Sequence, residues 1–227
     1  MVKLIQNLNQ IILFCKKKRT VKIKEQIIKV NIGSSLKVTK GWINIDGNFN
    51  MLFSNTPNSI LKFIYKISNV KKWYSEECFC STLKNNIFIH HNIAYGLPLN
   101  NNSVDFVFSS HLLEHFYYED AHKLLEEIYR VLKFGGIMRL NIPDLEYAIN
   151  LYLTGNKKKS LEYFFPDSKA DAFSQHHYMY DYEMIFEILT KIGFTKIQRC
   201  AFQKGSTPDI KFLDNRPEET LFVEAIK

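Results

Sequence analysis

The sequence is poor in the residues that build small stapled folds or membrane spans. Its 227 residues include only four cysteines, six prolines and nine glycines. Four cysteines do not make a disulfide framework in a chain of this length, and Cys78 and Cys80 lack the spacing of a zinc half-site. No apolar run reaches the roughly 18 residues that a spanning helix needs. We therefore expect reduced thiols, no metal site and a cytoplasmic protein whose core is large enough to fold unaided.

Acidic residues are missing from the first 24 positions, which hold seven basic side chains. The rest of the chain carries 23 basic and 23 acidic residues, so the net charge of +7 belongs to one segment and not to a surface. A broad nucleic-acid-binding face is therefore not expected on the body of the protein.

The same segment has the pattern of an amphipathic helix over residues 2–15. Its apolar face is expected to contain Leu4, Ile5, Leu8, Ile11, Ile12 and Cys15, with Leu13 and Phe14 off that face. A basic run follows at 16–24. Two interpretations remain open: the helix lies on the inner face of a membrane with its cations near anionic headgroups, or it packs on the domain. We divide the chain into a basic amphipathic segment, 1–24, and a domain, 25–227.

Short apolar runs alternate with helical periodicity through the rest of the chain. Seven runs are typical of buried strands: 27–32, 42–46, 87–91, 104–109, 137–142, 196–202 and 220–226. Helices are expected at 60–67, at 118–132 with a glycine cap at Gly135 or Gly136, and from the N-cap Asp181 to Gly193. This alternation predicts an α/β fold with a doubly wound, mostly parallel seven-stranded sheet. Only about ten residues separate the first two strands, so the first crossover should be shortened.

Ligands of such sheets bind at the carboxyl ends of the strands. Gly33 follows the first strand and lets the backbone approach a ligand, while Asp46 ends the second strand, where a carboxylate can accept both hydroxyls of a ribose. Either residue can also simply form a turn. The short crossover leaves no helix to hold a pyrophosphate, which favours a cofactor without phosphates over NAD or ATP.

Four motifs occur in a specific order: VNIGSS at 30–35, GWINID at 41–46, YGLPLNNNSVDFVFSSHLLEHF at 95–116 and EEIYRVLKFGGIMRLNIPD at 126–144. In this order they resemble class I S-adenosylmethionine-dependent methyltransferases, in particular the type 11-like, small-molecule branch. GWINID and the short crossover resemble predicted methyltransferases encoded with surface-glycan genes. The resemblance implies a Rossmann-like methyltransferase fold, S-adenosylmethionine as cofactor, a small-molecule or glycan-linked acceptor, and a role in polysaccharide biosynthesis.

The resemblance also implies cofactor-binding roles for residues at the strand ends. The turn at Gly33 would pass under the methionine part and Asp46 would hold the ribose. The full set is Asn31, Gly33, Ser35, Asp46, Asn92, Ile93, Leu97 and Ser109. Asn31 stands where the family usually has an acid, and Ser35 where it has a second glycine. These departures leave a second reading open, a non-catalytic methyltransferase-like binding module in a glycan-assembly or membrane-associated complex.

Several polar residues are expected on the acceptor side: His111, Glu114, His115, Asp144, His176, His177 and Tyr180. Alignment supplies most of the rate of a methyl transfer, but a sugar hydroxyl also benefits from a base. His111 and His177 are the predicted catalytic residues, because a histidine titrates in the required range. His111 and His115 also have the spacing of metal ligands, although the sequence shows no third ligand.

Overall fold

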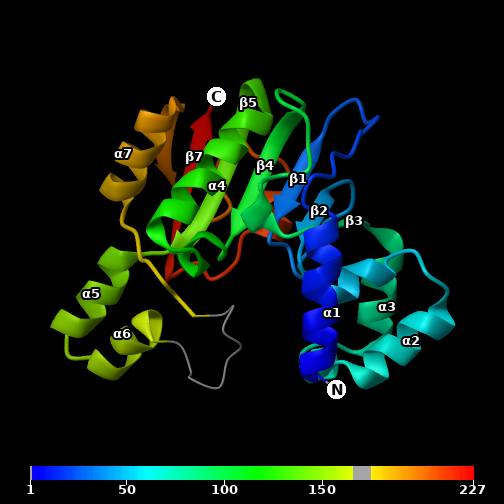
Figure 1. Ribbon diagram of the computed structural model, residues 1–227. Coiled ribbons are helices and arrows are strands. Elements are labelled where there is room, and N and C mark those ends of the chain that lie inside the picture. Colours follow the sequence, from blue (N-terminus) through cyan, green and yellow to red (C-terminus); the bar gives the residue numbers. More distant parts are fainter. Residues whose placement is uncertain (1, 166–174) are drawn as a thin grey trace.

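Seven apolar segments form the strands of one sheet in the computed structural model, which describes residues 2–165 and 175–227 (Figure 1). The strands are β1 Lys29–Ile32, β2 Ile43–Asp46, β3 Ile87–His90, β4 Val104–Ser110, β5 Leu132–Pro143, β6 Thr195–Cys200 and β7 Thr220–Ile226. Their order is β3-β2-β1-β4-β5-β7-β6; β7 pairs antiparallel with β5 and β6, and all other neighbouring strands are parallel. The predicted doubly wound, mostly parallel sheet is confirmed.

The first crossover is short, as predicted. Residues 33–42 contain no helix, and β1 pairs directly with β2 through Val30 opposite Ile43 and Ile32 opposite Ile45. The side-chain amide of Asn31 donates to the Lys37 carbonyl at 3.0 Å and thereby ties the crossover to β1.

Eight α-helices lie around the sheet within the described residues. They are α1 Val2–Cys15, α2 Asn58–Ile67, α3 Glu76–Asn85, α4 Tyr118–Val131, α5 Leu145–Leu153, α6 Lys157–Phe164, α7 Tyr182–Ile192 and α8 Ile210–Leu213. Helices α1, α2 and α3 gather beside β3, whereas α5 and α6 lie beyond the far end of β5 (Figure 1). Residues 113–115 form a short 3-10 helix, η4 Leu113–His115, after β4.

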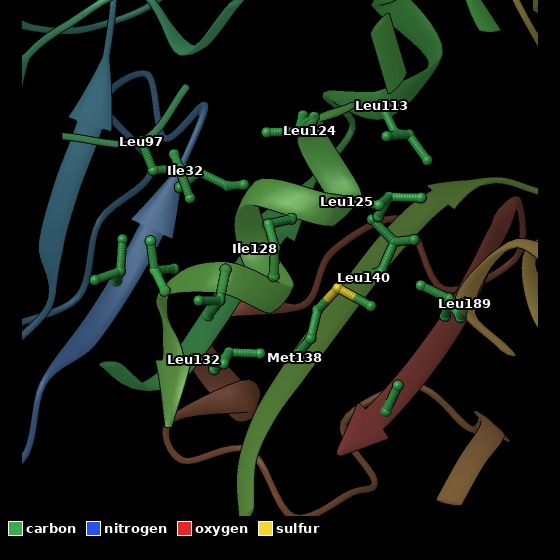
Figure 2. Packing of buried hydrophobic residues seen from close by; sticks show 14 of the residues in the cluster. Ile32, Leu97, Leu113, Leu124, Leu125, Ile128, Leu132, Met138, Leu140 and Leu189 are labelled. Carbon is green, nitrogen blue, oxygen red and sulfur yellow. The ribbon is translucent and has the colours of Figure 1, made fainter. Parts of the chain in front are cut away.

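The main core lies between the sheet and the apolar faces of α4 and α7. Figure 2 shows Leu125 and Ile128 of α4 close to Met138 and Leu140 of β5. Successive strand residues point to opposite faces, so Val107 joins this core while Phe108 packs with Trp42 and α8 on the other side.

The sequence predicts the ends of helix α7 correctly but not the end of helix α4. Asp181 caps α7 by accepting from the Met184 backbone N–H at 2.9 Å, and Gly193 ends it in the left-handed region, as predicted. The predicted glycine cap of α4 is wrong. That helix ends at Val131, and the chain becomes extended at Leu132, because β5 begins there and pairs with β4.

Helix α1 occurs where the pattern predicts it, and it docks on the domain. It buries Leu13, a residue expected to lie off the apolar face, and leaves Leu8, Ile11 and Phe14 exposed. A side-chain clasp holds it: the Asn9 amide donates to the Gly47 carbonyl at 2.9 Å, and His90 bonds to Asn9 and Lys16. Among the described residues, none of the helices combines the length and apolarity needed to cross a bilayer.

Candidate active site

The carboxyl ends of β3, β2, β1 and β4 lie side by side at one edge of the sheet. Asp46 pairs with His90, and Ile32 pairs with both Ile45 and Ser109. The turns that follow these strands therefore adjoin one another, and the strand order changes direction between β1 and β4. In an open α/β sheet this is the position of the ligand crevice.

The turn after β1 requires a glycine. Gly33 has φ +65°, and a Cβ there would lie 2.7 Å from Cδ1 of Leu112 in the segment after β4. Ser35 is also left-handed, with φ +46°, a conformation that is uncommon for residues other than glycine. The backbone N–H of Ser35 donates to Oδ2 of Asp46 at 2.7 Å. The structure thus ties the turn at Gly33 and Ser35 to Asp46, and their role in cofactor binding stays a prediction.

Backbone donors orient the Asp46 carboxylate. Its second oxygen, Oδ1, accepts from the Asn48 backbone N–H at 2.7 Å. Burial raises the pKa of this carboxyl, and the two backbone N–H groups act in the opposite direction. Each carboxylate oxygen has more than one acceptor direction, so both can still accept a ligand hydroxyl. A fixed carboxylate at this position is suited to a pair of neighbouring hydroxyls.

The predicted adenine-side residues follow β3. Asn92 uses its side-chain oxygen to cap the next short helix, accepting from the Ala94 N–H at 3.0 Å. Ile93 and Leu97 belong to the main core, so they form the floor of this region rather than an open wall. Ser109, in β4, is likewise buried.

Asn31 is predicted to bind the cofactor, but in the structure its side chain bonds to the crossover and to β2. Its amide nitrogen bonds to the Lys37 carbonyl and to the Asn44 side chain, and Asn31 itself is buried. It therefore supports the short crossover.

A pocket of about 490 Å³ opens beyond β4 and η4. It is lined by His111, Glu114, His115, Lys159, Glu162, Tyr163, His176, Arg216 and Glu219. His111 enters it from a left-handed backbone position with φ +50°. Such conformations cost free energy in a residue with a side chain and concentrate at functional sites.

Glu114 is the unusual group in this pocket. It is 1% exposed, and no described residue hydrogen-bonds to either of its carboxylate oxygens. His111 Nδ1 lies 3.4 Å and His176 Nε2 4.0 Å from Glu114 Oε1. Burial acts to raise the pKa of this carboxyl, but contact with His111 and the nearby His115 leave it below its ordinary value. A buried charge without hydrogen bonds is costly, so its retention calls for a functional explanation.

The two predicted catalytic histidines have different surroundings. His111 lines the pocket, whereas the ring of His177 stacks on Tyr117, with centroids 4.2 Å apart. The backbone N–H of His177 donates to the Glu114 carbonyl at 2.7 Å, and this contact carries the neighbouring His176 into the pocket.

Two other acceptor-side candidates have structural contacts. Asp144 caps α5 and pairs with Arg199 at 2.7 Å, and Tyr180 is buried in the main core. Sequence reasoning missed five lining residues from α6 and the segment before β7: Lys159, Glu162, Tyr163, Arg216 and Glu219. Only one α6 residue, Ser160, is buried, so this helix has no apolar stripe by which a sequence pattern could reveal it.

Residues 68–140 match a family model described as a methyltransferase domain. The matched stretch runs from the end of α2 into β5, so it includes β4, η4 and α4 but not Gly33 or Asp46. A search of curated proteins found no match.

Solved structures similar to this chain include SAM-dependent methyltransferases from three organisms. The one from Archaeoglobus fulgidus has 16% identity and a TM-score of 0.48, with 98% of this chain and 94% of that chain covered. The one from Thermotoga maritima has 15% identity and a TM-score of 0.48, with 96% and 90% covered. The one from Aquifex aeolicus has 16% identity and a TM-score of 0.46, with 90% and 84% covered.

The matched stretch, residues 68–140, is described as a methyltransferase domain, and this match supports methyl transfer with S-adenosylmethionine as the cofactor. The described residues fit that molecule: Asp46 can accept from a ribose diol, the turn at Gly33 lacks a side chain, and a cofactor without phosphates needs no helix after β1. The resemblance seen in the sequence is confirmed at the level of the class, while its surface-glycan part stays a prediction.

Proposed function

We propose that this methyltransferase acts on a hydroxyl group of a small-molecule or glycan-linked acceptor, as a step of polysaccharide biosynthesis. The observation that carries the proposal is the pocket beyond β4, whose lining combines three histidines with acidic and basic side chains. Such a lining suits a polar acceptor with several hydroxyls. The pocket begins where β4 ends, beside the turn at Gly33, so an acceptor in it would lie next to the methyl donor.

When bound, S-adenosylmethionine would supply an activated methyl group for the acceptor oxygen, with S-adenosylhomocysteine as the leaving group. In this proposal the chain itself aligns the two molecules and removes the hydroxyl proton. His111 is the proposed base because it lines the pocket at the end of β4. His177 is the second candidate; its ring would have to leave Tyr117 to reach the acceptor.

Cofactor binding tests the proposal directly. Wild-type protein is expected to bind S-adenosylhomocysteine in a calorimetric titration. Asp46→Ala should bind more weakly by about 1.5–3 kcal/mol, because the ribose hydroxyls lose a charged acceptor. His111→Ala is the matched control and should bind like wild type, since it lies on the acceptor side. Equal affinity in wild type and Asp46→Ala would contradict the assignment of Asp46.

The alternative is a non-catalytic binding module, and two observations favour it: Asn31 is committed to the crossover, and Ser35 keeps a side chain in a left-handed turn. The same titration separates the two. A module that has lost its cofactor would show no heat of binding at millimolar S-adenosylhomocysteine.

We also propose that residues 1–24 contact a membrane surface from the cytoplasmic side. Leu8, Ile11 and Phe14 are 48%, 61% and 65% exposed, and the basic run at 16–24 follows them. Each cation near an anionic surface contributes about 1 kcal/mol at low salt. Docking through Leu13 leaves this contact possible, because Leu13 is buried while Leu8, Ile11 and Phe14 stay exposed.

Liposome co-sedimentation tests this proposal. Wild type should sediment with anionic liposomes at low salt and less at high salt, whereas Ile11→Glu and Phe14→Glu should remain in solution. Neutral liposomes serve as the lipid control. Sedimentation that is equal for wild type and both variants would refute the contact.

A further inference from the structure

The pocket contains a set of donors that neither the family match nor methyl transfer explains. Glu114 and His115 adjoin in η4, and His176 comes from the segment before α7. One potential ligand atom from each of the three lies within 4.8 Å of the other two. We propose that Glu114, His115 and His176 bind a divalent zinc ion at the floor of this pocket.

The protonation of the two histidines supports this assignment. His115 Nδ1 contacts the Gln175 carbonyl at 3.0 Å, and His176 Nδ1 contacts the Tyr163 carbonyl at 2.5 Å. A carbonyl oxygen can only accept, so both Nδ1 atoms must carry the proton. The Nε2 atoms are then left with free lone pairs. A backbone carbonyl that fixes one ring nitrogen so that the other can ligate is the usual outer contact of a metal-bound histidine.

Glu114 supplies the third, independent observation. A carboxylate that is 1% exposed and lacks a hydrogen bond from any described residue needs a compensating charge. A divalent cation provides that charge. Two imidazoles and one carboxylate are also the protein ligands of a common type of catalytic zinc site, which keeps a further position open.

The geometry requires only a small adjustment. Ligand atoms around a zinc ion bound at about 2.1 Å lie about 3.4 Å apart, so loading would shorten the separations of up to 4.8 Å between the three atoms by up to about 1.4 Å. The open position would face the acceptor pocket. If the proposed function holds, an acceptor hydroxyl bound there would lose its proton more readily, because a metal ion lowers the pKa of a coordinated oxygen. The metal site itself does not depend on that function.

The test is binding of Zn²⁺ alone to chelator-treated, full-length protein, measured by calorimetry in the absence of any cofactor. Wild type is expected to bind one ion per chain. Glu114→Gln and His176→Ala should each weaken binding by at least about 100-fold, because each removes a direct ligand and loss of even an outer contact costs about 10- to 100-fold. His122→Ala is the matched control: His122 faces Glu126 at 3.9 Å on the surface of α4, a histidine–carboxylate pair outside the pocket.

Cobalt gives a second readout that a structural role would not produce. Co²⁺-loaded wild type should show visible absorption bands of a four- or five-coordinate ion, and Glu114→Gln and His176→Ala should lose them. A thermal melt of each variant separates loss of ligand from loss of fold, and His115→Gln replaces any variant that does not fold. No stoichiometric zinc in wild type, or equal affinity in wild type and the pocket variants, would overturn the site. Failure of S-adenosylhomocysteine binding in the earlier titration would overturn the proposed function but leave this result standing.

Discussion

Two regions of this molecule contain buried carboxylates, and the two differ in the hydrogen bonds that those carboxylates accept. On the β5–β7 side, Arg139 is fully buried between Asp214 and Glu224. In the pocket beyond β4, Glu114 is equally buried but lacks a hydrogen bond from any described residue. We interpret the Arg139 cluster as part of the fold, and Glu114 as a residue that binds a ligand.

The Arg139 cluster satisfies its charges from every side. Asp214 accepts from two guanidinium nitrogens of Arg139, from the Asn141 amide and from the Gln203 backbone N–H. Glu224 accepts from the N–H groups of residues 206 and 207. Arg139 also donates to the carbonyls of residues 201 and 204, so the cluster ties the loop after β6 to the centre of β5.

The Glu114 group shows the contrary pattern. The Nδ1 protons of His115 and His176 point to backbone carbonyls, and His111 Nδ1 lies 3.4 Å from Glu114 Oε1 without a hydrogen bond. A bound cation would complete this arrangement. The comparison teaches that the partners of a buried charge, rather than its burial, distinguish a structural residue from a functional one.

The largest expected effect comes from breaking the hydrogen-bonded cluster around Arg139. Arg139→Met should lower the free energy of unfolding by about 3–5 kcal/mol, because it leaves two buried carboxylates without their partner. Urea denaturation of wild type and variant measures this difference. Arg199→Met, which breaks an ion pair whose arginine is half exposed, is the matched control and should cost no more than about 1 kcal/mol. Equal losses would show that burial has no special weight here.

The second prediction concerns His90, a buried titratable group whose partners suit only its neutral form. Burial and the Lys16 ammonium lower the pKa of His90 from 6.5 to about 4. The unfolded chain therefore takes up a proton near pH 6.5 that the folded chain resists until about pH 4. Stability contributed by neutral His90 is full above pH 6.5 and falls by up to about 3 kcal/mol as the pH drops to 4.

This pH effect is measured as the free energy of unfolding between pH 7.5 and 4.5 for wild type and His90→Gln. Wild type should lose more stability over that window, because glutamine cannot take up the proton. Parallel curves would mean that the pKa of His90 is not lowered in the folded protein.

The smallest expected effect on the free energy of unfolding comes from replacing Glu114, in contrast to Arg139. Glu114→Gln should change the free energy of unfolding of metal-free protein by less than about 1 kcal/mol, or raise it, since a buried charge without hydrogen bonds is removed. Thermal melts in chelator, with Asp214→Asn as the paired variant, give the comparison. A loss in Glu114→Gln as large as that in Asp214→Asn would place Glu114 among the structural charges.

Local sequence patterns were sufficient for the sheet and the strand-end turns. Alternating apolar runs predicted all seven strands, and Asp181 and Gly193 marked the limits of α7. These features depend on residues close in sequence, whose spacing, capping oxygens and backbone freedom act locally. The cap of α4 was missed because pairing with β4, a contact distant in sequence, extends the chain at Leu132.

The pocket depended on contacts that no local pattern encodes. His176 joins Glu114 only because the backbone of the next residue bonds to η4, more than 60 positions earlier in the chain. Helix α6 lines the same pocket without an apolar stripe of its own. The sequence alone determined the class of fold and the place of Gly33 and Asp46, because strand ends and turns follow from local chemistry. The tertiary structure decided which charges have partners, because those partners come from segments far apart in the chain.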